Sequence, residues 1–330
     1  KLKKKIYIWC CEKYLNTGEG ILANKFINDL KYYNKNFNFI IKFPNSRILL
    51  FLRKFLGKVT DRIICPFFGI IYLWFIYLKK NNNRICYVNY LPLWNFLIFL
   101  LLPPKTILGP ITGGSLFLKK PFLNFFFRNY FLSFFYIISK FILKLRKKKL
   151  LFSTDLLKKK LKNNQNYFFN YVLKDLKIHK KKTNKEYDLI FYLRNHKNKN
   201  TNLQMELAKQ LSKKFKIITV GKKIYNYNIK NLGFISRIKL LKFLKKTKFA
   251  FLSPENLYSL FAIDCINSKT NIFFKKDKKY KSKNLKGIIY LDYNNRLSLS
   301  KKINKELKKK FSFKIKNFSK EINFENYLKL

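Results

Sequence analysis

Residues 6–30 read IYIWCCEKYLNTGEGILANKFINDL, and this stretch decides the fold class. The apolar run Ile6–Cys11 has the length and composition of a buried strand. Asn16–Gly20 carries a turn signal, and in Ile21–Leu30 the apolar residues recur at helical spacing. A strand, a glycine loop and a helix in this order predict the first βα unit of a parallel sheet.

Strands and helices alternate through both halves of the 330-residue chain. The first half has predicted strands at 38–42, 85–89 and 105–108, and predicted helices near 47–56, 93–102 and 121–149. The second half has predicted strands at 188–193, 216–220, 249–253, 271–274 and 287–291, and predicted helices at 202–215, 235–247, 258–267 and 296–311. This pattern predicts an α/β fold with two Rossmann-like domains facing a cleft, which is the default ligand site.

The predicted domain boundaries follow the change in composition between the halves. A polar, lysine-rich stretch lies between the last apolar helix of the first half and the first strand of the second. We therefore predict one Rossmann-like domain at 1–165, a linker at 166–184, a second Rossmann-like domain at 185–305 and a basic helix or tail at 306–330.

Uncharged stretches in the first half raise a membrane-spanning alternative. Residues 63–78 and 85–104 contain no charged side chain, and a transmembrane helix requires about 20 apolar residues. Because Asn89 and Pro92 interrupt the second stretch, a strand, a loop and a helix are favoured there. The aromatic region 121–149 has basic flanks, and it suits either a helix lying on a membrane or a core helix.

The charge of the chain is extreme, with 72 Lys and Arg against 16 Asp and Glu and a formal net charge of +56. Nucleic-acid binding is disfavoured because only nine of these residues are Arg, the side chain suited to bidentate phosphate and base contacts. Lys, Asn, Ile, Phe and Tyr are all abundant, and all five are encoded by AT-rich codons. Codon bias in the genome would therefore give this composition without selection for a binding partner. Attraction to an anionic membrane surface fits the same charge.

Cysteine and histidine usage argues against a metal or disulfide framework. The two His residues make a His-based metal site unfavourable, and we expect no metal and no cofactor. The five cysteines are odd in number and lie in apolar runs, which favours buried thiols in a reducing compartment. They are Cys10, Cys11, Cys65, Cys86 and Cys265.

Four side chains of the second half stand where open α/β sheets bind ligands. Arg194 ends the first strand of that half and Lys199 follows five residues later, so both are placed to stabilise a departing diphosphate. Glu255 follows the strand 249–253, and Asp264 lies on the next helix. Carboxylates there hold sugar or ribose hydroxyls, or instead cap the helix and pair with a surface Lys.

These residues and the glycine loops together resemble the glycosyltransferase family 4 type of GT-B enzymes. The resemblance covers most of the chain and implies catalytic roles for Arg194, Lys199 and Glu255. It implies donor binding by Gly18, Glu19, Gly20, Gly221, Phe234, Ser253, Asn256, Leu257, Tyr258, Ser259 and Asp264, and an acceptor-side loop at Thr112, Gly113 and Gly114. The family's second donor-site acid is expected at Ile263, one residue before Asp264.

The resemblance implies that the N-terminal domain binds a glycan or glycolipid acceptor and the C-terminal domain a nucleotide-sugar donor. The activity implied is a metal-independent hexosyl transfer in surface polysaccharide or lipopolysaccharide assembly. It implies a cytoplasmic protein, peripheral on the inner face of the membrane, with no nucleic-acid partner. An inverting, fucosyltransferase-like GT-B enzyme, a homologue without catalysis and a basic nucleic-acid- or membrane-binding protein remain alternatives. The sugar, the nucleotide base, the acceptor and the stereochemical course stay open.

Overall fold

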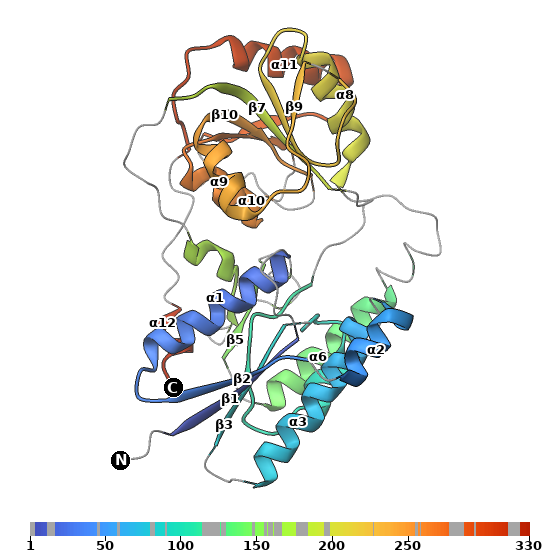
Figure 1. The fold of residues 1–330 in the computed structure, drawn as a ribbon, viewed down its shortest axis with the longest axis vertical. Helices are drawn as coiled ribbons and strands as arrows, with labels where there is room; N and C mark the ends of the chain where they lie inside the picture. The colour runs from blue at the N-terminus through green and yellow to red at the C-terminus, as the bar shows by residue number, and fades with distance from the viewer. Residues whose placement is uncertain are drawn as a thin grey trace. The chain divides into compact units, whose positions relative to one another are not determined.

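The chain folds into two compact units in the computed structural model (Figure 1). Unit 1 comprises Lys1–Tyr171 and Ile322–Leu330, and unit 2 comprises Val172–Glu321. The structure describes residues 4–11, 17–44, 47–57, 60–79, 83–89, 91–113, 126, 130–146, 149–154, 157, 161, 167–175, 184–194, 199–226, 228–254, 257, 259–276, 287–293, 295–315 and 324–330.

Unit 1 is built on a four-stranded sheet in the order β2-β1-β3-β4, and every neighbouring pair is parallel. The strands are β1 (Lys5–Cys10), β2 (Asn38–Lys42), β3 (Arg84–Val88) and β4 (Ile107–Leu108). A bridge between Ile111 and Phe152 leads on to a second parallel pair, β5 (Leu150–Leu151) and β6 (Tyr167–Phe168). The central strands are apolar on both faces because helices cover both sides of a parallel sheet.

Among the described residues that precede its C-terminal segment, unit 1 has the helices α1 (Gly18–Tyr33), α2 (Arg47–Leu56), the π-helix η1 (Thr60–Ile64), α3 (Cys65–Lys79), α4 (Phe96–Leu101) and α6 (Leu132–Leu145). Helix α1 begins where the Thr17 side chain accepts a hydrogen bond from the Gly20 amide at 3.0 Å. Its apolar residues at helical spacing are buried on one face of the sheet. Helix α3 packs closely, because a Cβ on Gly69 would lie 2.2 Å from the Trp9 indole.

The C-terminal segment belongs to unit 1, whereas the sequence placed residues 306–330 after the second domain as a basic helix or tail. Helix α12 (Glu325–Leu328) contacts α1, and Asn34 after α1 makes two hydrogen bonds with this segment. Its Nδ2 donates to the Leu328 carbonyl at 2.5 Å, and its Oδ1 accepts from the Leu330 amide at 2.8 Å. The segment docks because Phe324 and Leu328 bury apolar side chains in the core beside α1.

Unit 2 contains a six-stranded, wholly parallel sheet in the order β12-β11-β10-β7-β8-β9. Its strands are β7 (Tyr187–Leu193), β8 (Ile217–Gly221), β9 (Ile229–Asn231), β10 (Thr247–Phe251), β11 (Asn271–Lys275) and β12 (Ile289–Leu291). Its helices are α8 (Thr201–Leu211), α9 (Arg237–Lys245), α10 (Leu260–Asn267) and α11 (Arg296–Lys308). The strand order reverses between β7 and β10, and this is the topological switch point of a doubly wound sheet.

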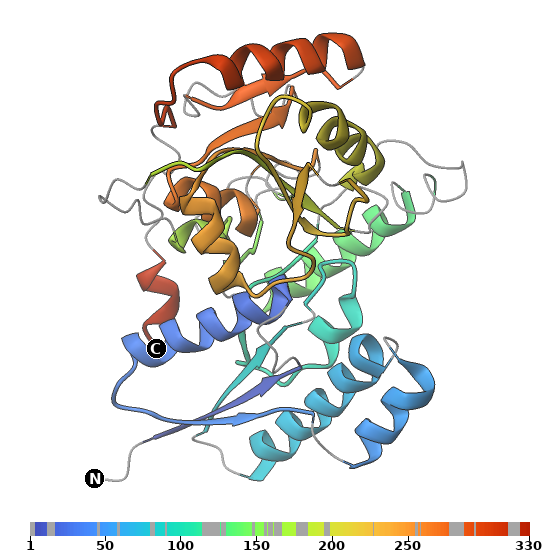
Figure 2. The same cartoon turned by 45° about the horizontal axis from the view of Figure 1, so that its top comes forward.

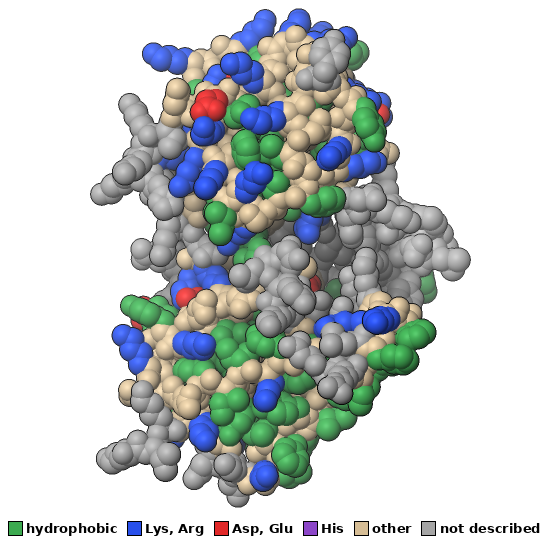
Figure 3. Space-filling view, in the orientation of Figure 1, with side chains coloured by type: hydrophobic (Ala, Val, Ile, Leu, Met, Phe, Trp, Pro, Cys, Tyr) green, Lys and Arg blue, Asp and Glu red, His purple; other side chains and the backbone are tan. Residues whose placement is uncertain are grey.

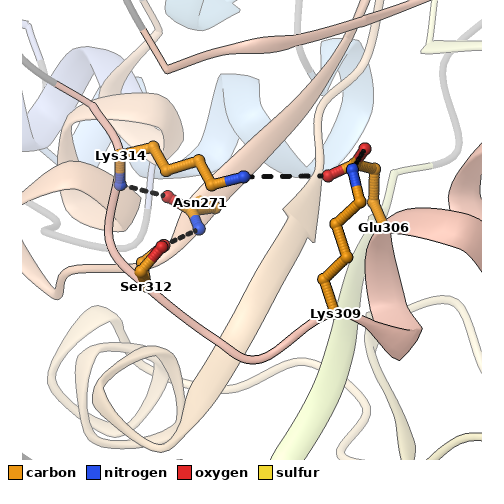
Figure 4. A network of polar contacts seen from close by, with 5 residues as sticks. All are labelled: Asn271, Glu306, Lys309, Ser312 and Lys314. Carbon is orange, nitrogen blue, oxygen red and sulfur yellow. Dashed lines mark hydrogen bonds and ion pairs between the residues drawn. The ribbon is translucent and has the colours of Figure 1, made fainter.

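The chain that follows α11 is fixed to the start of β11 (Figure 4). Asn271 donates from Nδ2 to the Ser312 carbonyl at 2.7 Å and accepts from the Lys314 amide at 3.0 Å. Glu306 at the end of α11 pairs with Lys309, and with the Lys314 ammonium at 4.0 Å. These contacts lie at the amino edge of β11, so they stabilise unit 2 at the edge opposite the carboxyl ends of its strands.

The predicted fold class is confirmed, because both units are parallel α/β layers of the Rossmann type. Residues 166–184 were predicted to form a linker, but β6 and the 3-10 helix η3 (Tyr171–Asp175) lie within this stretch. Phe169 and Tyr171 are buried there, because aromatic side chains in an otherwise polar stretch join the core of unit 1. All five cysteines are buried, as predicted.

The uncharged stretches of the first half form short helices beside strands. Residues 63–78 fall on η1 and on α3, which has 15 residues, while residues 85–104 form β3 and the six-residue α4. In the part of the chain that the structure describes, no helix is both long enough and apolar enough to cross a bilayer.

Candidate functional site

The candidate site of unit 2 lies at the carboxyl edge of its sheet, beside the switch point. Strands β7 and β10 are neighbours in parallel register, with Phe191 opposite Phe251. Arg194 follows β7 and is exposed, while Ser253 follows β10 and is half-buried. Two segments singled out from the sequence therefore leave the sheet side by side, where parallel α/β sheets bind ligands.

The loop after β7 is fastened to the first turn of α8. The Thr201 hydroxyl donates to the Arg194 carbonyl at 2.5 Å, and Gln204 Nε2 donates to the Lys199 carbonyl at 2.6 Å. The Arg194 guanidinium carbon lies 5.6 Å from the centre of the Tyr192 ring, and the side chain remains exposed. Arg194 and Lys199 thus flank the start of a helix, where backbone amides and basic side chains both favour an anion.

Gly221 ends β8 opposite Leu193, the last residue of β7. Its φ is +97°, and a Cβ on this residue would lie 2.0 Å from the Leu193 carbonyl oxygen. The Gly221 amide donates to the Gly233 carbonyl at 2.8 Å, which draws in the chain that follows β9. Phe234 comes next and its ring is 86% exposed. The glycine is needed here because any side chain would push the two strand ends apart.

Asp264 forms a buried ion pair with Arg237. The guanidinium donates from Nη2 to Oδ1 at 2.6 Å and from Nε to Oδ2 at 3.0 Å, and the carboxylate side chain is only 3% exposed. This pair joins the first turn of α9 to the middle of α10. A surface Lys was one predicted partner for Asp264, but the partner in the structure is Arg237. The ion pair anchors α10, the helix that follows the 253–259 segment.

Arg237 was missed by the sequence reasoning, although a signal for it existed. Arg is scarce in this chain, and that scarcity singled out Arg194. The same argument applied to Arg237 at the first position of α9 would have marked it.

The start of α10 is well defined where the structure describes it. The Ser259 hydroxyl caps the helix by accepting from the Ala262 amide at 3.2 Å, and Leu257 is fully buried. Serine capping explains why the helix begins at Leu260 rather than at the predicted 258. Glu255, Asn256 and Tyr258, predicted to be catalytic or donor-binding, lie outside the described residues, as does Gly114.

The remaining predicted site residues belong to unit 1. Gly18, Glu19 and Gly20 form the first turn of α1, which follows β1 at the carboxyl edge of that sheet. Thr112 is part of a backbone ladder: its amide donates to the Leu91 carbonyl, and its carbonyl accepts from the Leu93 amide, both at 2.9 Å. The neighbouring Gly113 has φ +129°. The segment around Thr112 is therefore held by hydrogen bonds in unit 1.

The described carboxyl edge of unit 2 carries mainly basic charge. Among the residues that the structure describes, no three His, Cys, Asp or Glu side chains come together in a group that could hold a metal ion. The thiols are inert, because burial raises the pKa of Cys11 and of Cys265 well above the ordinary value. Described basic residues follow three strands at this edge: Arg194 and Lys199 after β7, Lys222 and Lys223 after β8, and Lys276 after β11.

Comparison with known proteins supports the fold. No protein-family model matches the sequence, and no curated protein matches it either. Solved structures do match: UDP-GlcNAc 2-epimerase from Methanocaldococcus jannaschii has a TM-score of 0.52 at 14% identity, over 96% of this chain and 95% of that one. Sucrose-phosphate synthase from Thermosynechococcus elongatus has a TM-score of 0.54 at 10% identity, over 92% and 90%. A glycosyltransferase from Rickettsia africae has a TM-score of 0.52 at 14% identity, over 92% and 88%.

These identities are low, so the likeness establishes the fold alone. The protein has the GT-B fold class, with two Rossmann-like units. Because a fold of this kind hosts more than one activity, the function has to be argued from the site.

Proposed function

We propose that the chain is a glycosyltransferase that takes a sugar from a nucleotide-sugar donor held by unit 2. One observation carries the proposal: in a GT-B fold, the exposed Arg194 stands at the carboxyl end of a strand flanking the switch point, with Lys199 beside the next helix. An exposed Arg and a Lys at a helix start favour a diphosphate. The exposed Phe234 ring, after the edge strand β9, offers an aromatic face to a nucleobase.

In the proposed reaction, an acceptor hydroxyl oxygen forms a bond to the anomeric carbon of the donor sugar. The bond from that carbon to the diphosphate oxygen breaks, and the nucleotide diphosphate leaves with the electron pair. Arg194 and Lys199 stabilise the negative charge that develops on the leaving oxygen. Glu255 would hold donor hydroxyls, and Asp264 would act through Arg237 by fixing α10. No metal or cofactor takes part in this scheme.

The acceptor in this proposal is a glycan or lipid-linked glycan of surface polysaccharide or lipopolysaccharide assembly. Hexosyl transfer of the family 4 type and an inverting, fucosyltransferase-like reaction both fit the described site. Thr112, Gly113 and the first turn of α1 are the unit 1 residues proposed to face the substrates.

A nucleotide-sugar epimerase is the second candidate, because three of the similar structures, from two organisms, are UDP-GlcNAc 2-epimerases, one of them putative. An epimerase would use the same kind of donor site but would release an altered nucleotide sugar rather than a free nucleotide diphosphate.

Incubation of the full chain with a panel of nucleotide sugars, with and without a membrane glycolipid extract, separates these activities. A transferase releases nucleotide diphosphate in an acceptor-dependent manner, and Arg194→Ala should slow it about 100-fold or more, as for loss of one charge-stabilising donor. Lys246→Ala removes an equal charge from an exposed position at the amino end of β10 and should leave the rate unchanged. A new nucleotide sugar formed without acceptor would establish the epimerase. No turnover of any donor would refute both.

A further inference from the structure

Unit 1 carries apolar side chains on the outward-facing sides of three helices. Helix α3 is apolar all round: its buried side packs on the sheet through Gly69, Ile70 and Leu73, yet Ile71 and Phe75 on the other side are 67% and 58% exposed. A helix that is apolar all round in a soluble domain is normally buried. Helix α3 is therefore covered on only one of its two apolar sides.

The same arrangement recurs on the neighbouring helices. On α6, Tyr136 and Leu143 are buried, whereas Ile137 and Phe141 are 66% and 61% exposed. On α2, the rings of Phe51 and Phe55 contact each other at 4.8 Å between centroids, and both are exposed. We define the apolar face of unit 1 by Phe51, Phe55, Ile71, Phe75, Ile137 and Phe141.

These helices form one connected surface. Helix α2 joins α3 through η1, and Figures 1 and 2 show α2 and α3 next to each other. Helix α4 links α3 to α6: the Trp74 indole donates to the Leu101 carbonyl at 2.7 Å, and the Phe96 ring lies 5.4 Å from the Phe135 ring. Figure 3 shows hydrophobic side chains gathered along the edge of unit 1 where α2 and α3 run. Exposed apolar surface of this extent marks an interaction site.

The charge on this surface selects the partner. Helices α2, α3, α4 and α6 contain no Asp or Glu, and α2, α3 and α6 carry basic residues beside the apolar stripes. Lys54, Lys79 and Lys144 are exposed, and the Lys79 ammonium lies 5.3 Å from the centre of the Phe75 ring. Long basic side chains bordering apolar ones match a membrane interface, where the stems lie along acyl chains and the ammonium groups reach anionic head groups.

A second copy of the chain fits this surface poorly. Two copies would each bring a formal net charge of +56, so their apolar faces would meet against strong repulsion. An anionic bilayer supplies both an apolar phase and the opposite charge. We infer that the apolar face of unit 1 docks onto the surface of a membrane containing anionic lipid, with α2, α3 and α6 lying in the head-group region.

Vesicle co-sedimentation of the full chain tests this inference. The variant Phe55→Ser/Ile71→Ser/Phe141→Ser removes one exposed apolar side chain from each of α2, α3 and α6. Exposed side chains are chosen because replacing them affects folding least. The matched control is Leu297→Ser on α11 of unit 2, because Leu297 is 74% exposed, as much as the residues replaced. Vesicles are phosphatidylcholine alone or phosphatidylcholine mixed with phosphatidylglycerol, at low and high salt, and circular dichroism verifies folding.

Wild type and Leu297→Ser should bind the anionic vesicles, and the triple variant should bind about tenfold more weakly or worse. High salt or removal of phosphatidylglycerol should weaken wild-type binding. Equal binding of the triple variant and wild type, or no binding by wild type, would overturn the inference. So would a lipid-free wild-type dimer, seen by analytical ultracentrifugation, that the triple variant abolishes. Nucleotide binding by unit 2 is measured without lipid, so failure here leaves the proposed activity untouched.

Discussion

Replacing Asp264 by Asn tests whether the buried ion pair anchors α10. The substitution keeps the shape of the side chain but removes the charge that faces Arg237 across 2.6 and 3.0 Å. Removing one partner of a fully buried pair costs about 3–5 kcal/mol. The Arg237 side chain is 28% exposed, and water can solvate part of the uncompensated guanidinium, so we expect a loss of about 2–3 kcal/mol.

The complementary variant Arg237→Met leaves the Asp264 carboxylate, the more deeply buried partner, without the opposite charge. It should therefore lower the free energy of unfolding by at least as much. The double variant should recover part of the loss, with a coupling free energy of about 1–2 kcal/mol. Glu186→Gln is the control, because Glu186 and Lys246 lie 2.7 Å apart but are 44% and 50% exposed. This control should not change stability measurably, since exposed pairs contribute little.

Hydrogen exchange by mass spectrometry is the suitable assay. The three Trp residues, Trp9, Trp74 and Trp94, all belong to unit 1, so their fluorescence does not report on unit 2. The free energy of opening of peptides covering α10 and β11 should fall in the single variants, while Trp fluorescence melting of unit 1 stays unchanged. Opening energies that match the control, or single effects that add with no coupling, would refute the anchoring role of the pair.

Three further predictions concern stability. Gly221→Ala should destabilise unit 2 by at least about 2 kcal/mol in urea unfolding, because Gly221 has a positive φ and the added Cβ would clash with Leu193. Gly18→Ala should not be destabilising, because no atom lies within 4 Å of the added Cβ. Burial lowers the pKa of Lys185 to about 8, so the unfolded state binds more protons between about pH 8 and 10.4 and stability rises there with pH. The Lys185→Met variant should not show this rise in stability with pH. Parallel profiles of stability against pH for the variant and wild type would contradict the prediction. Asn34→Ala should release the C-terminal segment, seen as faster proteolysis there, while unchanged protection would argue against docking through Asn34.

Strong periodicity made most of the fold predictable from the sequence. Strand Asn38–Lys42 and helix Arg47–Leu56 have the predicted bounds, because each is a short run with one clear pattern between turn signals. Strand β9 was missed because only three residues, Ile229–Asn231, form it within a polar stretch. Strand β6 was hidden in the same way by its lysine- and asparagine-rich surroundings.

Contacts between distant residues were beyond the local pattern. The docking of Leu328 beside Asn34 joins residues almost three hundred positions apart, and nothing in the basic C-terminal stretch indicates it. The partner of Asp264 depends on how α9 packs against α10. The exposed stripe of α3 could not be predicted either, because a helix that is apolar all round gives no sign of which side faces outward.

The position of Arg194 was predictable for a simple reason. It ends a strand with an unambiguous apolar pattern, and the carboxyl ends of parallel strands share one edge. The sequence predicts only that Gly221 stands at the end of a strand. Its contact with Leu193 could not be predicted, because it depends on the register between β7 and β8.

Nucleotide binding by the full chain is the most direct test of the central claim. Thermal unfolding of wild type, Arg194→Ala and Lys246→Ala is measured with UDP, GDP and CMP, since a ligand at about 100 times its Kd adds about 2.7 kcal/mol of stability. The account predicts that one diphosphate nucleotide raises the melting temperature of wild type and Lys246→Ala but not of Arg194→Ala. An equal shift in Arg194→Ala, or no shift of wild type by any nucleotide, would contradict it.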